Sequence, residues 1–212
     1  MLKPLFAAAI ALAAVPAFAQ DAPAAFNGPY VGIQGGWQQD RQTLRVTDAG
    51  TETKSGNKSD GLAYGGQVGY DFRLSPTTVL GAEVALTGRT GSGFFDDGAS
   101  SFDLEQGRTV SATARLGYVM DPTGLLYVRG GYANAQYKLD DGFSRVSEDR
   151  DGYTIGAGYE RMLTRNVSAR VEYNYSDFGK DDLPDLAAAL GADDASLKYR
   201  RHAVTAGVNL RF

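Results

Sequence analysis

The stretch HAVTAGVNLRF, residues 202–212, carries the pattern that decides the fold. Every second residue from Val204 to Phe212 is apolar, and Thr, Gly, Asn and Arg alternate with these positions. A period of two residues is typical of a β-strand with one apolar and one polar face. Chain ends usually carry a few loose polar residues, whereas this pattern continues to Phe212. We therefore expect the last strand to be held within a sheet.

The composition limits the class of protein. Hydrophobic residues make up 43% of the 212 positions and charged residues 22%, which indicates a folded chain. The net charge of −4 argues against a nucleic-acid partner, which requires a basic surface. The absence of cysteine excludes disulfides and thiolate metal sites. The 27 glycines and 12 tyrosines are typical of closely packed β structure.

The first segment, 1–19, has the order of a cleavable secretory signal. A basic residue, Lys3, precedes an apolar run, and Ala-Phe-Ala follows at 17–19. The run is shorter than the roughly 20 residues that a transmembrane helix needs. We therefore predict cleavage after Ala19, an N-terminal lead-in over 20–28 and a folded domain over 29–212. No other stretch approaches a membrane helix, so a membrane-spanning version of this chain would cross with strands.

The mature chain contains eight segments with a two-residue period, each of about ten residues or longer, which suffices for a tilted bilayer crossing. They lie near 29–41, 60–72, 79–88, 108–120, 125–137, 152–162, 167–178 and 199–212. Short connections follow the second, fourth and sixth segments. Long connections follow the other four, near 42–59, 89–107, 138–151 and 179–198. This alternation predicts an all-β, eight-stranded antiparallel up-and-down barrel with one tight rim and one rim of long loops.

The two faces of the segments differ in charge. The apolar face carries no charged residue, and the other face mixes small residues with four acids and four arginines. A soluble lipocalin-like barrel would turn the charged face outward, but that face would then be rich in lysine and poor in glycine. We therefore expect the apolar face to contact lipid. Aromatic residues near the strand ends are candidates for interfacial girdles: Tyr30, Trp37, Phe72, Tyr118, Tyr137, Tyr153, Tyr175, Phe178 and Phe212.

Eight charged residues are expected to lie inside the barrel, where each needs a partner. They are Asp71, Glu83, Arg115, Arg129, Glu160, Arg170, Glu172 and Arg211. An eight-stranded barrel is only wide enough for its own side chains. We therefore expect a closed interior, with a small porin-like channel as the alternative.

Candidate sites for other chemistry are weak. His202, the single histidine, falls on the apolar face, where we interpret it as an interfacial imidazole rather than a catalytic or haem-binding group. Paired aspartates such as Asp96–Asp97 and Asp193–Asp194 are interpreted as solvated loop charge, because no calcium-binding spacing is present. No cofactor and no metal site are expected. The stretch 184–197 could form one short helix that ends at Gly191.

Several motifs resemble the outer-membrane β-barrel proteins of alphaproteobacteria, the small opacity-like or porin-like surface proteins. They include PYVGIQGGW at 29–37, YTIGAGYERMLTRNVSARVEYNYSDFG at 153–179 and the terminal Asn-x-x-Phe at 209–212. The resemblance covers nearly the whole mature chain. It implies a location in the bacterial outer membrane, with lipid and lipopolysaccharide as surroundings. It also implies that the terminal aromatic, Phe212, is read by the outer-membrane assembly machinery.

The expected function is structural or one of surface interaction, such as envelope integrity, loop display or adhesion to a host or surface partner at the long loops. A small channel is the alternative. A soluble exported lipocalin-like barrel and a lipid-modifying enzyme of the outer membrane are less favoured.

Overall fold

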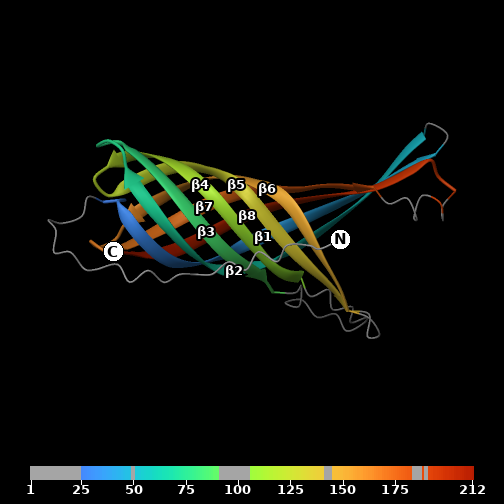
Figure 1. The fold of residues 1–212 in the computed structure, drawn as a ribbon, viewed down its shortest axis with the longest axis horizontal. Helices are drawn as coiled ribbons and strands as arrows, with labels where there is room; N and C mark the ends of the chain where they lie inside the picture. Colours follow the sequence, from blue (N-terminus) through green and yellow to red (C-terminus); the bar gives the residue numbers. More distant parts are fainter. Residues whose placement is uncertain (1–24, 49–50, 91–105, 141–144, 183–187, 189–190) are drawn as a thin grey trace, which may run out of the picture.

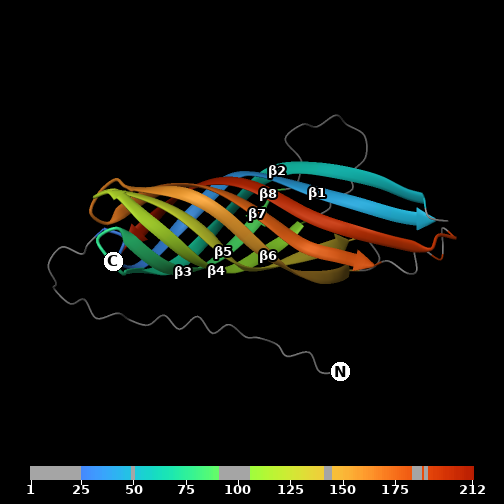
Figure 2. The same ribbon diagram turned by 90° about the horizontal axis from the view of Figure 1, so that it is seen from above.

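The computed structural model describes residues 25–48, 51–90, 106–140, 145–182, 188 and 191–212. Within these residues, eight antiparallel strands form a closed barrel in which each strand pairs with its neighbours in the sequence. Figures 1 and 2 show the strands wrapping around one long axis. The all-β, up-and-down barrel expected from the sequence is confirmed. The strands are β1 (Gly28–Asp48), β2 (Thr51–Arg73), β3 (Thr78–Arg89), β4 (Gln106–Asp121), β5 (Gly124–Asp140), β6 (Arg145–Met162), β7 (Val167–Asp182) and β8 (Asp194–Arg211).

The last strand closes the barrel. β8 lies between β7 and β1, and its pairing with β1 runs from Tyr30↔Arg211 to Thr47↔Asp194. The amide of Phe212 donates to the carbonyl of Pro29 at 3.1 Å, so the pairing continues to the final residue. Strand alternation persists to Phe212 because both edges of this strand are occupied.

One rim has tight turns, as the short connections predicted. In the turn between β4 and β5, the hydroxyl and the amide of Thr123 donate to the Asp121 carboxylate at 2.7 and 2.8 Å. These two hydrogen bonds hold the pKa of the Asp121 carboxyl below its ordinary value, and the bond from the hydroxyl has the larger effect. Both chain ends of the barrel wall lie at this rim, since Gly28 pairs with Asp71 close to the β2–β3 turn.

At the other rim, strands extend into three of the predicted loops. β1 and β2 stay paired from the barrel to Asp48↔Thr51, so the expected loop at 42–59 is mostly a hairpin. The expected loops at 138–151 and 179–198 are shortened in the same way, because β5, β6, β7 and β8 extend into them. The apolar alternation that marked the strands stops where the chain leaves the lipid, although the backbone pairing continues. Residues 91–105 lie outside the described residues, as does most of the helix expected to end at Gly191. Residues 194–197, the last of the stretch 184–197, belong to β8.

The polarity of the two faces of the wall is the reverse of that in a soluble protein. Large apolar side chains such as Ile33, Val128 and Leu116 are more than half exposed on the outside, whereas charged side chains are buried inside. This distribution fits a barrel whose solvent is lipid. Among the described residues, no helix is long and apolar enough to span a membrane.

The aromatic girdle differs from the expectation at two positions. Tyr30 and Phe178 are buried, with 2% and 4% exposure, and lie inside the barrel. Tyr30 has the parity of the charged face, and Phe178 lies beside a register shift in β7 that alters the alternation. The side chain of Tyr137 lies outside the described set. Five of the predicted aromatics are exposed on the outer surface: Trp37, Phe72, Tyr118, Tyr153 and Phe212.

A charge on the outer face should be most costly halfway up the wall. We expect Val84→Arg, in the middle of β3 (Thr78–Arg89), to lower the free energy of unfolding by about 2–4 kcal/mol, because a guanidinium there must enter the bilayer midplane. Tyr118→Arg, near the tight rim, should cost only about 0–1 kcal/mol. Urea unfolding in lipid vesicles measures both, and equal costs would show that the wall does not cross a bilayer at this depth.

Candidate functional site: the charged interior

All eight charged residues expected in the interior are buried inside the barrel. Their exposed fractions range from 0% for Asp71 and Glu160 to 8% for Arg129. They form two separate sets of ion pairs, which lie in two layers along the barrel axis. Each layer holds two carboxylates and two guanidiniums, so its formal charge is zero.

The first layer is a closed ring of four charges nearer the tight rim. It consists of Asp71, Arg115, Glu160 and Arg211, which come from β2, β4, β6 and β8. Arg115 donates from Nε to Asp71 at 2.8 Å and from Nη1 to Glu160 at 3.1 Å. Arg211 contacts the same two carboxylates, each at 2.8 Å. Every member of this lower ring therefore pairs with both members of opposite charge.

The second layer lies above the lower ring and comes from the odd-numbered strands. Arg129 on β5 bridges Glu83 and Glu172 at 2.9 and 2.8 Å. Arg170 on β7 also pairs with Glu83, and its Nη2 donates to Gln34 on β1 at 2.8 Å. These residues, Glu83, Arg129, Glu172, Arg170 and Gln34, form the upper ring.

The alternation of strands follows from barrel geometry. Strands in a closed barrel are tilted and staggered, so that inward residues from alternate strands share one level. The even strands therefore supply the lower ring and the odd strands the upper ring. Removing an ion from water costs several kcal/mol, and only close pairing with further hydrogen bonds offsets that cost. The balance of four acids and four arginines in the sequence reflects this requirement.

Two tyrosines connect the rings. Tyr30 donates its hydroxyl to Glu83 at 2.8 Å, and Tyr127 donates to Glu172 at 2.7 Å. The Arg115 guanidinium, which belongs to the lower ring, lies 4.7 and 5.2 Å from the centres of these two aromatic rings. Each tyrosine thus offers a hydrogen bond to one layer and a π-face to the other.

Glycines make room for these tyrosines. A Cβ atom at Gly69 would lie 2.3 Å from the hydroxyl oxygen of Tyr30, and one at Gly158 would lie 2.6 Å from that of Tyr127. Neither distance is compatible with a side chain unless the tyrosine moves. The glycines on the inward face are therefore part of the packing of the charged layers.

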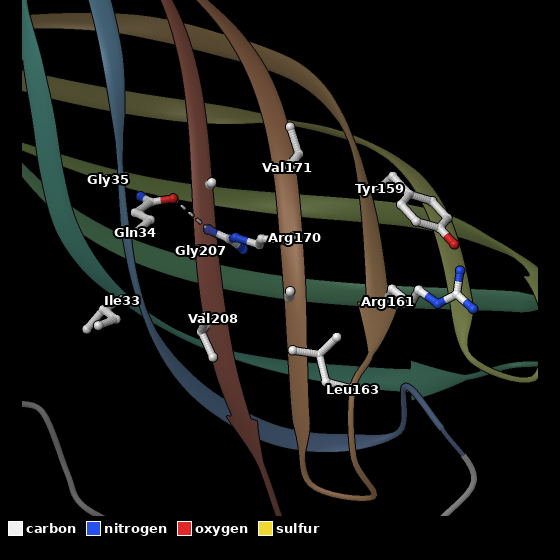
Figure 3. Close-up of a pocket in the computed structure, with 12 residues that line it drawn as sticks. Ile33, Gln34, Gly35, Tyr159, Arg161, Leu163, Arg170, Val171, Gly207 and Val208 are labelled. Atoms are coloured by element: carbon white, nitrogen blue, oxygen red, sulfur yellow. Dashed lines mark hydrogen bonds between the residues drawn. The ribbon is translucent and has the colours of Figure 1, made fainter.

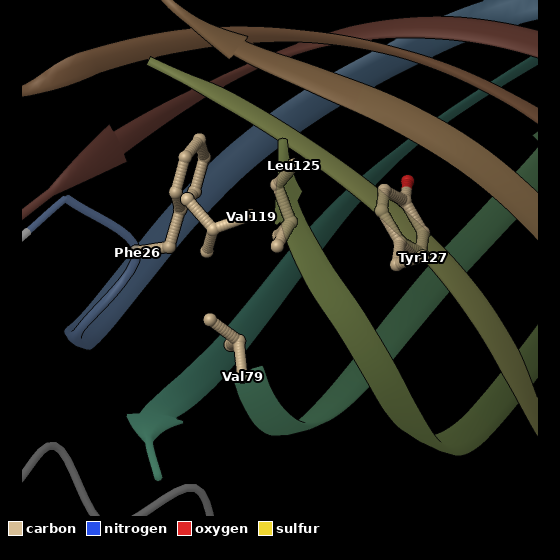
Figure 4. Packing of buried hydrophobic residues seen from close by; sticks show 5 residues of the cluster. All are labelled: Phe26, Val79, Val119, Leu125 and Tyr127. Carbon is tan, nitrogen blue, oxygen red and sulfur yellow. The ribbon is translucent and has the colours of Figure 1, made fainter. Parts of the chain in front are cut away.

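An apolar cluster, called here the plug, lies inside the barrel below the lower ring, and the sequence did not reveal it. Phe26, placed in the lead-in 20–28 by the sequence, is 1% exposed and packs beside Val79, Val119 and Leu125 (Figure 4). Its ring also lies 5.1 Å from the Arg211 guanidinium. The lead-in carries no strand periodicity, so no pattern marked Phe26 as an interior residue. Cleavage of the signal stays a prediction, because residues 1–24 lie outside the described residues.

A third charged cluster near the long-loop rim was also missed. Asp40 accepts from Arg201 at 2.8 Å and from Arg89 at 3.1 Å, and Arg201 lies 5.3 Å from the ring of Phe178. Asp40 and Arg201 continue the inward parity of β1 and β8. Both residues fall within the segments predicted at 29–41 and 199–212, at positions of inward parity, so the alternation could have identified them.

His202 lies on the outer wall, as its parity indicated. Its Nδ1 is 2.7 Å from the hydroxyl oxygen of Tyr173, and its ring is 5.2 Å from that of Tyr175. Among the described residues no group of three or more acidic or histidine side chains could hold a metal ion. Asp96, Asp97 and several other loop aspartates lie outside the described set.

The outer wall also carries a shallow groove, shown in Figure 3. Small residues on neighbouring strands, including Gly35, Ala206 and Ala169, form its floor, and bulkier side chains such as Ile33 and Leu163 border it. Gln34 and Arg170 reach its inner side from the upper ring. The groove opens to the lipid face, and these two residues connect it with the upper ring.

A closed barrel with a lipid-facing apolar wall and a charged interior defines an outer-membrane type of β-barrel protein. The sequence comparison specifies the family: the model of the outer membrane protein beta-barrel domain matches residues 5–212, and the chain belongs to this family. The protein is located in the bacterial outer membrane.

Related proteins come from alphaproteobacteria. The chain is 32% identical to the 25 kDa outer-membrane immunogenic protein of Brucella ovis over 84% of this chain and 83% of the relative. It is 31% identical to the 22 kDa outer membrane protein of Rhizobium leguminosarum bv. viciae over 92% and 83%. A similar solved structure is Neisserial surface protein A, with a TM-score of 0.48 and 17% identity, covering 88% of this chain and 98% of that one.

Removing one member of the lower ring should destabilise the barrel strongly. We expect Arg115→Met to cost about 3–5 kcal/mol of unfolding free energy, because Asp71 and Glu160 would each lose a buried partner. The matched control is Arg45→Met, which breaks an ion pair to Glu52 in which the arginine side chain is 47% exposed. It should cost no more than about 1 kcal/mol. Similar costs for the two variants, measured by urea unfolding in vesicles, would contradict the paired interior.

Proposed function

We propose that this protein is a closed outer-membrane barrel that displays a strand-built platform at the cell surface. The barrel acts as a rigid anchor, and the surface role belongs to the part of the sheet that projects from it. The observation that supports this proposal is the layered interior. Its charged side chains pair with one another across the width of the barrel and occupy the space through which a solute would pass.

Closure is supported at successive levels of the barrel. The Phe26 plug lies lowest, the lower and upper rings follow, and the Asp40 cluster lies towards the long-loop rim. Side chains in the two rings reach across the barrel, as the pairs Arg115–Glu160 and Arg170–Glu83 show. Moving these side chains aside to admit an ion would separate buried charges from their partners. An unpaired buried charge raises the free energy of the folded barrel.

Display is supported by the unequal heights of the wall. The pairing of β2 with β3 ends at Ala63↔Arg89, whereas β2 continues along β1 to Asp48↔Thr51. β8 accompanies β1 as far as Thr47↔Asp194. Figures 1 and 2 show this part of the sheet extending beyond the other strands. The longer connections of outer-membrane barrels face the cell exterior, and relatives of the chain are named immunogenic proteins.

An enzymatic role is not proposed. The imidazole of His202 is engaged with Tyr173 and Tyr175 on the outer wall, and Val204, the next residue on that face, offers no hydroxyl. The alternative function is a small channel. It draws support from the small interior residues above the upper ring, such as Gly131 and Thr154, which fill less of the barrel than the ring side chains do.

Closure predicts that the protein conducts no steady ion current. In planar bilayers the reconstituted full chain should show no stable openings at the nanosiemens scale, because the rings and the plug occupy the path. A matched sample unfolded in urea before addition controls for contaminating porins. Stable openings that appear only with the folded protein would favour the channel.

Display predicts the side of the membrane on which each rim lies. The chain has no cysteine, so a single introduced thiol can be labelled without background. On intact cells, a membrane-impermeant maleimide should label Thr53→Cys, in the projecting hairpin. It should label Arg165→Cys, in the tight turn between β6 and β7, only after the outer membrane is permeabilised. The reverse pattern would overturn the proposed display.

A further inference from the structure

Three cations form a row across the outer face of the projecting sheet. The strand registers pair Arg41 on β1 with Lys58 on β2 and with Arg200 on β8. Neighbouring strands are about 4.8 Å apart, so the row brings three positive charges within about 10 Å of width at the backbone. The parity of these residues continues that of Trp37, Leu62 and Val204, which face the lipid.

The row lies just above the apolar belt. Trp37, Leu62 and Val204 are paired with one another across the same three strands. Each lies four residues along its strand from one of the three cations. Four residues correspond to about 13 Å along a strand, and to less along the axis of a tilted barrel. This step places the cations beside the headgroups of the outer leaflet.

Two acids lie beside the row, Asp60 on β2 and Asp177 on β7. Asp60 is two residues along β2 from Lys58, and its carboxylate accepts a hydrogen bond from Gln39 at 3.0 Å. Arg41 and Lys58 form no ion pair within the described residues, and the buried Nε of Arg41 has no hydrogen-bond partner there. Arg200 lies 3.5 Å from Asp177, but that carboxylate also pairs with Lys198 at 3.2 Å. Lys198 lies on the same face, two residues along β8 from Arg200, and we include it with the three cations of the row. The patch of Arg41, Lys58, Arg200 and Lys198, called here the basic row, therefore has more positive than negative charge.

We propose that the basic row binds phosphate groups of lipopolysaccharide in the outer leaflet. Guanidinium groups match phosphate oxygens in pairs, and an ammonium group adds a point charge. The apolar rows beneath supply a wall for the acyl chains of the same molecule. This site lies on the outer wall, so it does not depend on whether the barrel interior is closed.

The test measures binding of fluorescently labelled bisphosphorylated lipid A to the full-length protein in zwitterionic detergent micelles. The variants are wild type, the triple variant Arg41→Ala/Lys58→Ala/Arg200→Ala, the single variant Lys58→Ala, and the control Arg108→Ala. Arg108 is an exposed arginine on β4, outside the row. The shift in gel mobility on boiling verifies that each variant is folded.

Each cation near a membrane surface contributes about fivefold to the binding of an anionic headgroup. Lys58→Ala should therefore weaken binding about fivefold, the triple variant about a hundredfold, and Arg108→Ala less than twofold. The single variant, whose side chain is exposed, keeps the test valid should the triple variant fail to fold.

Two further arms identify the ligand. Dephosphorylated lipid A should bind wild type and triple variant equally weakly, and phosphatidylglycerol should compete poorly with lipid A. Equal binding of lipid A by the wild type and Lys58→Ala would overturn the proposal. Full competition by phosphatidylglycerol would also overturn it, because the row would then be a general anion surface.

Discussion

The pairing of buried charges is the interaction on which the rest of the structure depends. A barrel of this width encloses about as many side chains as it can hold, and lipid on the outside forces the polar positions inward. Any charge placed there must find a partner within its own layer. The lower ring meets this requirement with four contacts among Asp71, Arg115, Glu160 and Arg211. The ring in turn determines where bulk is allowed, so that Gly69 and Gly158 lie opposite the tyrosines that join the two layers.

The lipid outside imposes the second constraint. Within the membrane every outward side chain must be apolar and every backbone group must pair, which requires a closed wall. β8 meets that requirement by pairing with β1 through Phe212. Beyond the membrane only the pairing requirement remains, and the outward face of the same strands becomes charged. The change from Trp37 to Arg41 along β1 marks this boundary.

The barrel could be predicted from the sequence because alternation survives wherever one face contacts lipid. The eight interior charges followed from the same parity. Three features could not be predicted in this way. The ring partners depend on stagger, which brings together residues as distant in sequence as Asp71 and Arg211. The hairpin at 42–59 has polar residues on both faces, so its strands have no apolar period. Phe26 enters the barrel from outside any strand, and its interior position depends on a turn of the backbone at positive φ, 61°, rather than on a pattern.

A double-mutant cycle on the pair Asp71 and Arg115 tests the central claim most directly. The free energies of unfolding of the wild type, Asp71→Asn, Arg115→Met and the double variant would be measured in lipid vesicles. The account predicts that the double variant loses about 2 kcal/mol less than the sum of the two single losses, because each single change strands a buried charge. Additive losses would contradict it, since they would show that the two charges do not depend on each other.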